Sequence, residues 1–160
     1  MKKQTSNLGK LILCIFLCEL SGIVGSLFTT KAIPTWYAGL IKPALNPPSW
    51  VFGPVWTVLY AMMGVAAFLV WKQGWQRKEV KIALGVFGLQ LVINALWSLL
   101  FFGLHNPLLA LIDILLLWLL ILVTMIVFYR ISKPAAYLLL PYLCWVSFAT
   151  YLNYAIYVLN

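Results

Sequence analysis

Five apolar stretches, each long enough to cross a lipid bilayer as a helix, constrain this sequence more than any other feature. A transmembrane helix needs about 20 predominantly apolar residues. Short segments rich in charged residues, Pro or Gly separate the stretches. The sequence predicts an all-α integral membrane protein in which one domain, residues 1–160, forms a compact bundle of five transmembrane helices. The predicted helices span residues 8–29, 48–71, 81–102, 107–129 and 134–159.

The low content of charged residues excludes a soluble protein. Only 9% of the 160 residues are charged, whereas a soluble domain has roughly 25%, so the surface of the folded chain has to face lipid. The 11 Lys and Arg residues outnumber the 3 Asp and Glu residues, an imbalance that can indicate nucleic-acid binding. Here the basic residues flank the apolar stretches, where they orient helices in a membrane. We therefore expect no nucleic-acid partner.

Positive charge is distributed unequally between the two sides that five consecutive spans define. The N-terminus and the second and fourth connections share one side, whereas the first loop, residues 31–47, lies on the other. Nine of the eleven basic residues are on the first side: Lys2, Lys3, Lys10, Lys72, Arg77, Lys78, Lys81, Arg130 and Lys133. Lys31 and Lys42 are on the second. The positive-inside rule predicts a multi-pass cell-membrane protein with its N-terminus inside and its C-terminus and first loop outside.

Polar and aromatic side chains from several spans fall at a similar depth, in the outer half of the membrane beneath the first loop. They are Trp50, Asn94, Trp97, Asp113 and Asn153. Polar groups within a membrane have to face the interior of the bundle, and an aromatic cavity with a few polar groups is typical of a site for an apolar ligand. The alternative is that these polar groups, Asp113 included, only pair with each other across helices.

Catalytic and metal-binding patterns of the usual kinds are absent from the sequence. His105 is the one histidine, and it falls in the third connection. Cys14, Cys18 and Cys144 lie inside apolar stretches, where we expect them to pack as small buried residues. We expect no metal site and no hydrolase, kinase or ion-channel activity.

Several groups of residues together form a specific pattern that covers nearly the whole chain. They are residues 36–43 (WYAGLIKP), 47–56 (PPSWVFGPVW), 59–60, 63–64, 94–97 (NALW), 101–103 (FFG), 111–113 (LID), 141–145 (PYLCW) and 148–154 (FATYLNY). This pattern resembles the TspO/MBR family, which comprises the tryptophan-rich sensory proteins and the mitochondrial translocator protein, once called the peripheral benzodiazepine receptor.

The resemblance implies frequent homodimers and a cavity that binds porphyrins such as protoporphyrin IX, or drugs of the isoquinoline-carboxamide and benzodiazepine types, with no cofactor required. The residues that it places in the cavity are Trp36, Tyr37, Pro43, Pro48, Trp50, Pro54, Tyr60, Asn94, Trp97, Trp145, Ala149 and Leu152. Gln90, Asp113 and Asn153 are expected to support this site as polar groups. At its rim, we expect Lys31 or Lys42 to pair with the porphyrin propionates.

Other functions remain open beside tetrapyrrole binding. The site could degrade bound porphyrin in light and oxygen, with Trp50 and Trp145 as the photochemical pair. It could instead transport tetrapyrroles or other lipophilic molecules, or serve in stress sensing through protein partners. No basic residue follows Tyr154, as the sterol-recognition pattern of animal members would require, which favours a prokaryotic member with tetrapyrrole ligands. Small residues spaced like Ser21 and Gly25 are common at helix dimer interfaces and lend the dimer weak support.

Overall fold

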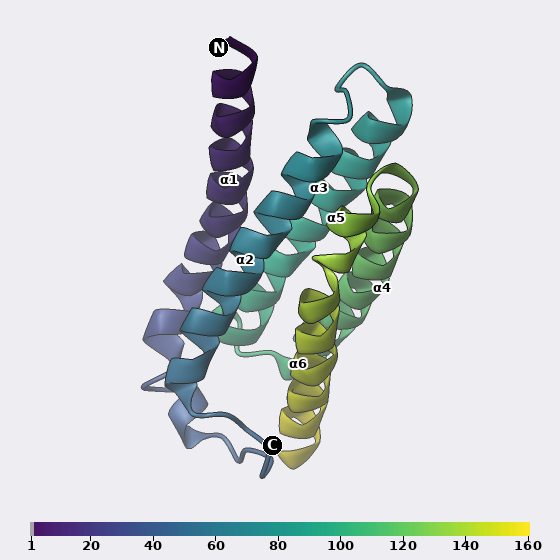
Figure 1. Cartoon of the computed structure of the whole chain (residues 1–160). Helices are drawn as coiled ribbons and strands as arrows, with labels where there is room; N and C mark the ends of the chain where they lie inside the picture. The colour runs from purple at the N-terminus through teal and green to yellow at the C-terminus, as the bar shows by residue number, and fades with distance from the viewer. Residues whose placement is uncertain (1) are drawn as a thin grey trace.

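The computed structural model describes the backbone of residues 2–160 and the side chains from residue 7 onward. Within this part of the chain, five helical segments are long and apolar enough to cross a membrane. They pack side by side in one bundle (Figure 1), which confirms the predicted all-α fold class. The segments are Asn7–Ala32, Ser49–Trp71, Lys78–Gly103, Pro107–Ile131 and Lys133–Leu159.

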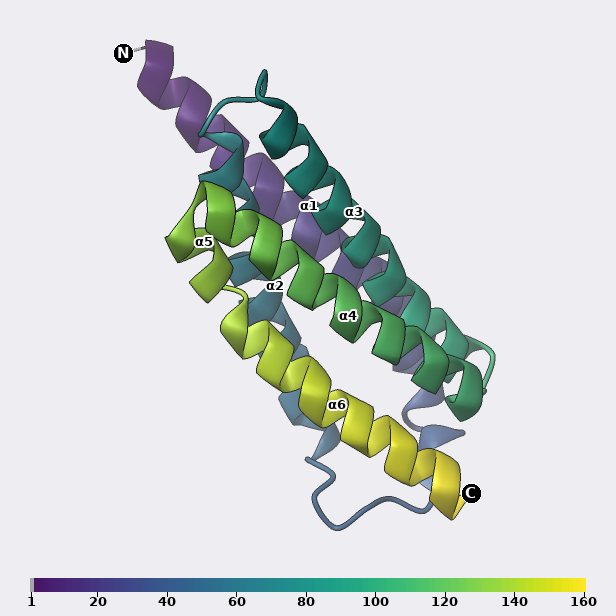
Figure 2. The ribbon, with the colours of Figure 1, turned by 90° about the vertical axis from the view of Figure 1, so that its right-hand side faces the viewer.

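The individual elements follow the predicted spans, with two interruptions. In chain order they are α1 (Lys2–Ala32), η1 (Tyr37–Gly39), α2 (Ser49–Trp71), α3 (Lys78–Ser98), η2 (Leu99–Gly103), α4 (Pro107–Ile131), α5 (Lys133–Tyr137) and α6 (Leu140–Leu159). The element η1 is a single 3-10 turn, whereas η2 is a π-helical turn. Each spanning segment runs antiparallel to the next one along the chain (Figures 1 and 2).

The fifth predicted span is divided into α5 and α6 because of a proline. Pro141 has no backbone N–H, and its ring collides with the carbonyl four residues earlier. The chain therefore leaves the α-helical pattern just before it, where the Leu139 N–H bonds to the Ala136 carbonyl at 3.1 Å. Figure 1 shows α6 continuing from this break in a direction that diverges from α2.

The third span ends in a turn that is wider than an α-helical one. In η2, the Leu104 N–H bonds to the carbonyl of Leu99 at 2.8 Å, five residues back. Single π-helical turns of this kind frequently occur at functional sites. The next helix begins immediately afterwards: the Asn106 side chain accepts a hydrogen bond from the Leu109 N–H at 3.0 Å, and Pro107 occupies the first turn, where a missing N–H costs nothing.

The bundle has two chemically different ends. We call the end that carries residues 33–48, the α3–α4 connection and Asn160 the loop end, and the other the N-terminal end (Figure 1). At the N-terminal end, Lys10 lies over the Trp71 ring and Lys133 over the Tyr129 ring, as basic residues do at membrane surfaces. The side chains of Lys2 and Lys3 lie outside the described residues. Which end faces the cytoplasm stays a prediction of the positive-inside rule.

Small residues allow α1 to lie directly against α2. A Cβ atom on Gly22 would collide with the Tyr60 ring, and one on Gly64 would collide with the backbone of Ile15. Lipid tails are as apolar as the side chains of membrane helices, so no hydrophobic effect drives these helices together. Close approach of their backbones is therefore a main source of their association. The position of α1 in the bundle therefore depends on these two glycines.

We expect Gly64→Ala to lower the free energy of unfolding by about 1–3 kcal/mol, because the new methyl group meets backbone that cannot rotate away. Gly85→Ala is the matched control, since nothing lies within 4 Å of the position its Cβ would take and Ala favours the helix. Thermal unfolding of both variants in one detergent measures the difference. Equal midpoints for the two variants would contradict this account of α1 packing.

Candidate ligand cavity

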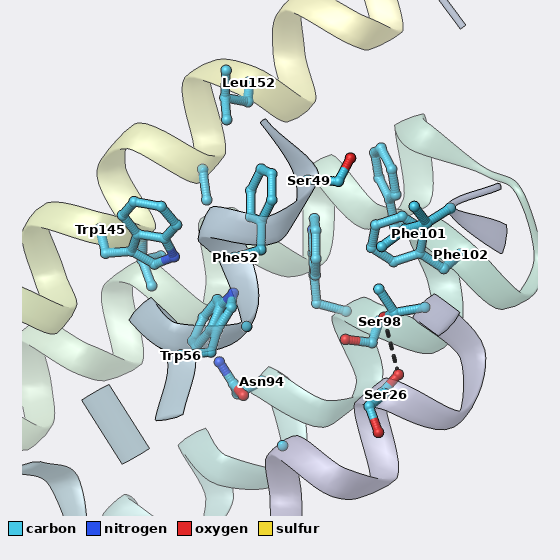
Figure 3. Close-up of a pocket in the computed structure, with 18 of the residues that line it drawn as sticks. Ser26, Ser49, Phe52, Trp56, Asn94, Ser98, Phe101, Phe102, Trp145 and Leu152 are labelled. Carbon is cyan, nitrogen blue, oxygen red and sulfur yellow. Dashed lines mark hydrogen bonds between the residues drawn. The ribbon is translucent and has the colours of Figure 1, made fainter. Parts of the chain in front are cut away.

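A cavity of about 580 Å³ lies inside the loop-end half of the bundle. Small-molecule sites in proteins commonly have volumes of about 300–1,000 Å³, so its size suits one drug-sized or larger flat molecule. Its walls come from α1, α2, α3 with η2, α4 and α6, and Tyr37 contributes from the first loop. Figure 3 shows side chains from α2, α3, η2 and α6 facing one another across this space.

One wall is an aromatic stripe on α2. Phe52, Trp56 and Tyr60 are spaced four residues apart, so they share one helix face, and all three line the cavity. The rings of Trp56 and Tyr60 are stacked with centroids 5.4 Å apart. Trp145 of α6 meets Phe52 edge to face at 6.0 Å (Figure 3). These rings form an apolar surface on which a flat ligand can lie.

The π-helical turn supplies a second aromatic wall. The rings of Trp97 and Phe101 are stacked at 5.1 Å, and Phe102 packs edge to face on Phe101 at 4.8 Å. Tyr37 of the first loop covers this group, with its ring 6.3 Å from that of Phe101. The wider turn of η2 thus brings two consecutive phenylalanines to the cavity, since both of them line it.

Polar groups at the walls are mostly paired with each other. The Tyr60 hydroxyl donates to Asn94 Oδ1, and Asn94 Nδ2 donates to the Tyr142 hydroxyl at 3.1 Å. Trp97 Nε1 donates to Asn153 Oδ1 at 2.9 Å, while Asn153 Nδ2 donates to the Pro107 carbonyl at 2.8 Å. Because paired polar groups cost little when buried, these contacts hold α2, α3, α4 and α6 together around the cavity.

One buried polar atom of the lining has no partner among the described residues. Trp145 Nε1 is buried and unpaired, although its ring lines the cavity beside Phe52. A buried N–H without an acceptor is costly. This indole is therefore available to donate a hydrogen bond to a ligand.

The first loop closes the cavity at the loop end and is fastened at several points. The side-chain amide of Asn160 pairs with both the N–H and the carbonyl of Ile41, at 3.0 and 3.1 Å. The Tyr37 hydroxyl donates to Asn46 Oδ1 at 2.8 Å, and burial raises the pKa of Tyr37, which keeps that donor protonated. Lys42 Nζ lies 4.8 Å from the centre of the Tyr37 ring.

The structure brings most of the predicted ligand residues to the cavity. Those that line it are Tyr37, Trp50, Tyr60, Asn94, Trp97, Trp145, Ala149 and Leu152, together with the predicted supporting residue Asn153. Those that do not are Trp36, Pro43, Pro48 and Pro54, the supporting residues Gln90 and Asp113, and the rim residues Lys31 and Lys42. Trp36 instead stacks on His105 at 4.5 Å and meets the Phe101 ring edge to face at 5.5 Å.

The polar residues behave in two different ways. Asn94 and Asn153 pair across helices, which is the alternative that the sequence left open. Gln90 and Asp113 are buried, with exposed fractions of 1% and 5%, yet the Gln90 amide and Asp113 Oδ2 have no partner among the described residues. Neither residue lines the cavity.

Two parts of the lining were missed by the sequence analysis. The first is the Phe52–Trp56 part of the α2 stripe, which its four-residue spacing to Tyr60 could have revealed. The second is formed by Ser26, Thr29 and Thr30, which together with Glu19 make the α1 wall polar. Their spacing of three, four or seven residues places them on one helix face, a signal that was visible in the sequence.

The chain is similar to known proteins over nearly its whole length. The model of the TspO/MBR family matches residues 14–159. The tryptophan-rich protein TspO of Chlorobaculum tepidum is 52% identical over 160 residues, which cover 100% of this chain and 99% of that protein. The protein of the same name in Archaeoglobus fulgidus is 46% identical, over 96% of this chain and 99% of its own length. The human translocator protein is 44% identical, over 87% and 83% of the two chains.

The match thus extends over all five spans and the first loop, including the α2 stripe, Asn94, Trp97 and Trp145 of the cavity. Family membership and the five apolar helices together make this chain a multi-pass membrane protein. The chain belongs to the TspO/MBR family.

Proposed function

We propose that this protein binds a porphyrin or a similar flat, lipophilic tetrapyrrole in the loop-end cavity. The observation that carries the proposal is a pair of aromatic walls that both line the cavity, Phe52–Trp56–Tyr60 with Trp145 and Trp97–Phe101. Figure 3 shows Phe52, Trp56 and Trp145 across the cavity from Phe101 and Phe102. Aromatic rings gain about 0.5–1.5 kcal/mol from stacking beyond the area that they bury. A large flat π-system is the ligand shape that gains most from two such walls.

The charges of the first loop suit a ligand that carries carboxylates at one edge. Lys42 is held beside Tyr37, with Nζ bonded to the carbonyls of Ala38 and Leu40 at 3.3 and 3.2 Å. Lys31, in contrast, is exposed in the last turn of α1. Since Tyr37 lines the cavity, Lys42 is the better placed of the two predicted rim charges. We propose that the propionates of the porphyrin point toward the loop end, which the positive-inside rule places outside the cell.

Tryptophan fluorescence during titration of the purified protein with protoporphyrin IX in the dark tests binding. We expect saturable quenching, and an affinity about tenfold weaker in Trp145→Leu, because loss of one stacked ring and of its free N–H costs roughly 1.5 kcal/mol. Trp75→Leu is the control, as Trp75 is exposed at the N-terminal end and does not line the cavity. Quenching that does not saturate would contradict the proposal.

The rim charge is tested by comparing protoporphyrin IX with its dimethyl ester. Lys42→Ala should weaken binding of the diacid by about two- to fivefold, since exposed ion pairs contribute up to about 1 kcal/mol, and should leave the ester unaffected. Lys133→Ala is the matched control: its ammonium also lies over a tyrosine ring, that of Tyr129, but at the opposite end of the bundle. If the diacid binds Lys42→Ala as tightly as the unmodified protein, the propionates point elsewhere.

Light-dependent breakdown of the bound porphyrin is the second candidate function. It is favoured by the presence of both Trp50 and Trp145 in the lining of the same cavity. Trp50 is 75% exposed, so it stands at the mouth, whereas Trp145 is partly buried inside. Indoles beside an excited macrocycle can donate electrons to it. Transport of a lipophilic molecule, which the name of the human relative suggests, is the remaining alternative.

Illumination of the complex in the presence of oxygen should bleach the porphyrin Soret band if the tryptophans take part in such chemistry. The variant Trp50→Phe/Trp145→Phe keeps aromatic rings in both places, so it should bind porphyrin in the dark but bleach it several-fold more slowly. Equal bleaching rates in the variant and the original protein would remove the two indoles from the reaction. A stable Soret band in the original protein would leave binding without turnover.

A further inference from the structure

The wall of the cavity that α1 forms contains an acidic side chain that tetrapyrrole binding does not use. Glu19 lines the cavity, one turn before Gly22, against which the Tyr60 ring packs. Tyr60 and Asn94 form the hydrogen-bonded group on the opposite helices at this depth. Glu19 therefore lies at the deep end of the cavity, far from the first loop and from Lys42.

The Glu19 carboxylate has no partner within the part of the chain that the structure describes. The ion pair found there is Arg77–Glu79, in the α2–α3 connection and the first turn of α3. The hydroxyl groups of the same wall are not free to serve it, because Ser26, Thr29 and Thr30 donate to carbonyls of their own helix at 2.7, 3.1 and 2.7 Å. A carboxylate within a membrane span is costly unless a partner neutralises it, and the cavity leaves space for that partner.

The cavity lining carries negative charge without any positive charge. None of the residues that line the cavity is Lys, Arg or His, whereas Glu19 is an acid. Asp113 is buried and does not line the cavity, and Lys31 and Lys42 lie outside the lining at the loop end. The field at the deep end therefore favours a positively charged ligand group, the opposite of what the rim favours.

The lining of the cavity also contains aromatic rings that can attract a cation. Trp56 and Tyr60, stacked at 5.4 Å, line the cavity along with Glu19. A cation within about 6 Å of such a ring is attracted to its face, and aromatic cages recognise quaternary ammonium groups in this way. We propose that the deep end of the cavity binds lipophilic organic cations, with Glu19 as the counter-ion and the Trp56–Tyr60 pair as the aromatic surface. This site does not depend on tetrapyrrole binding.

Two ligands of equal shape and different charge test the proposal in lipid nanodiscs of zwitterionic lipid. The probes are (biphenyl-4-ylmethyl)trimethylammonium and its uncharged carbon isostere, 4-neopentylbiphenyl, and calorimetry measures their affinities. Glu19→Gln should weaken binding of the cation by about 10- to 100-fold, as expected for the loss of one member of a desolvated charge pair, and leave the isostere unchanged. Glu79→Gln removes an equal charge from an exposed site and should change neither affinity.

Equal affinity of the cation for Glu19→Gln and the original protein would overturn the proposal, as would an equal loss for both probes. Should Glu19→Gln not fold, Ile23→Lys gives the same information. Ile23 lines the cavity, is 54% exposed and lies four residues after Glu19, where a lysine pairs with the carboxylate along the helix. Ile23→Lys should weaken binding of the cation and leave the affinity for the uncharged isostere unchanged.

Discussion

An unpaired backbone N–H or C=O costs several kcal/mol in the hydrocarbon core of a bilayer, because no water is present to replace the missing bond. The chain satisfies this requirement with helices almost throughout, and its two departures are local. One is the π-helical turn at Leu99–Gly103, where the Leu99 and Leu100 carbonyls accept hydrogen bonds from the N–H groups of Leu104 and Asn106. The other is the break before Pro141. Both departures shape the cavity: the first places Phe101 and Phe102 in its wall, and the second lets α6 diverge from α2 (Figure 1).

The cavity remains open because separate contacts at its deep end and at the loop end fix the positions of the surrounding helices. Near its deep end, Tyr60, Asn94 and Tyr142 connect α2, α3 and α6 through hydrogen bonds, while Gly22 and Gly64 bring α1 onto α2. At the loop end, Asn160 fastens the first loop to the end of α6. Large rings occupy the levels between these two attachments, and their stacking on each other leaves faces free toward the cavity. A flat ligand therefore meets preformed walls, which lowers the entropy that binding costs.

The charges around the cavity are separated along its length. Lys42 lies at the loop end and Glu19 at the deep end, so a ligand with a carboxylate and a ligand with an ammonium group would orient in opposite senses. Between the two charges the lining is apolar or internally hydrogen-bonded, and screening by water is weak there. Both proposed ligand classes can thus use one set of aromatic walls, with a different charged residue selecting each of them.

The sequence by itself determined the five spans and the separation of charge between the two ends, because lipid forces a long apolar segment to be helical and basic residues to its ends. It also identified Trp97, Asn94 and Trp145 as residues of a shared region through their motifs. Only the tertiary structure decided which face of each helix looks inward. In a soluble helix the apolar face marks the core, but here lipid-facing and core-facing sides are both apolar. For that reason hydropathy alone does not separate Pro54, which is exposed, from Phe52 and Trp56, which line the cavity. The stacking of Trp36 on His105 joins two connections, so no helical pattern encodes it.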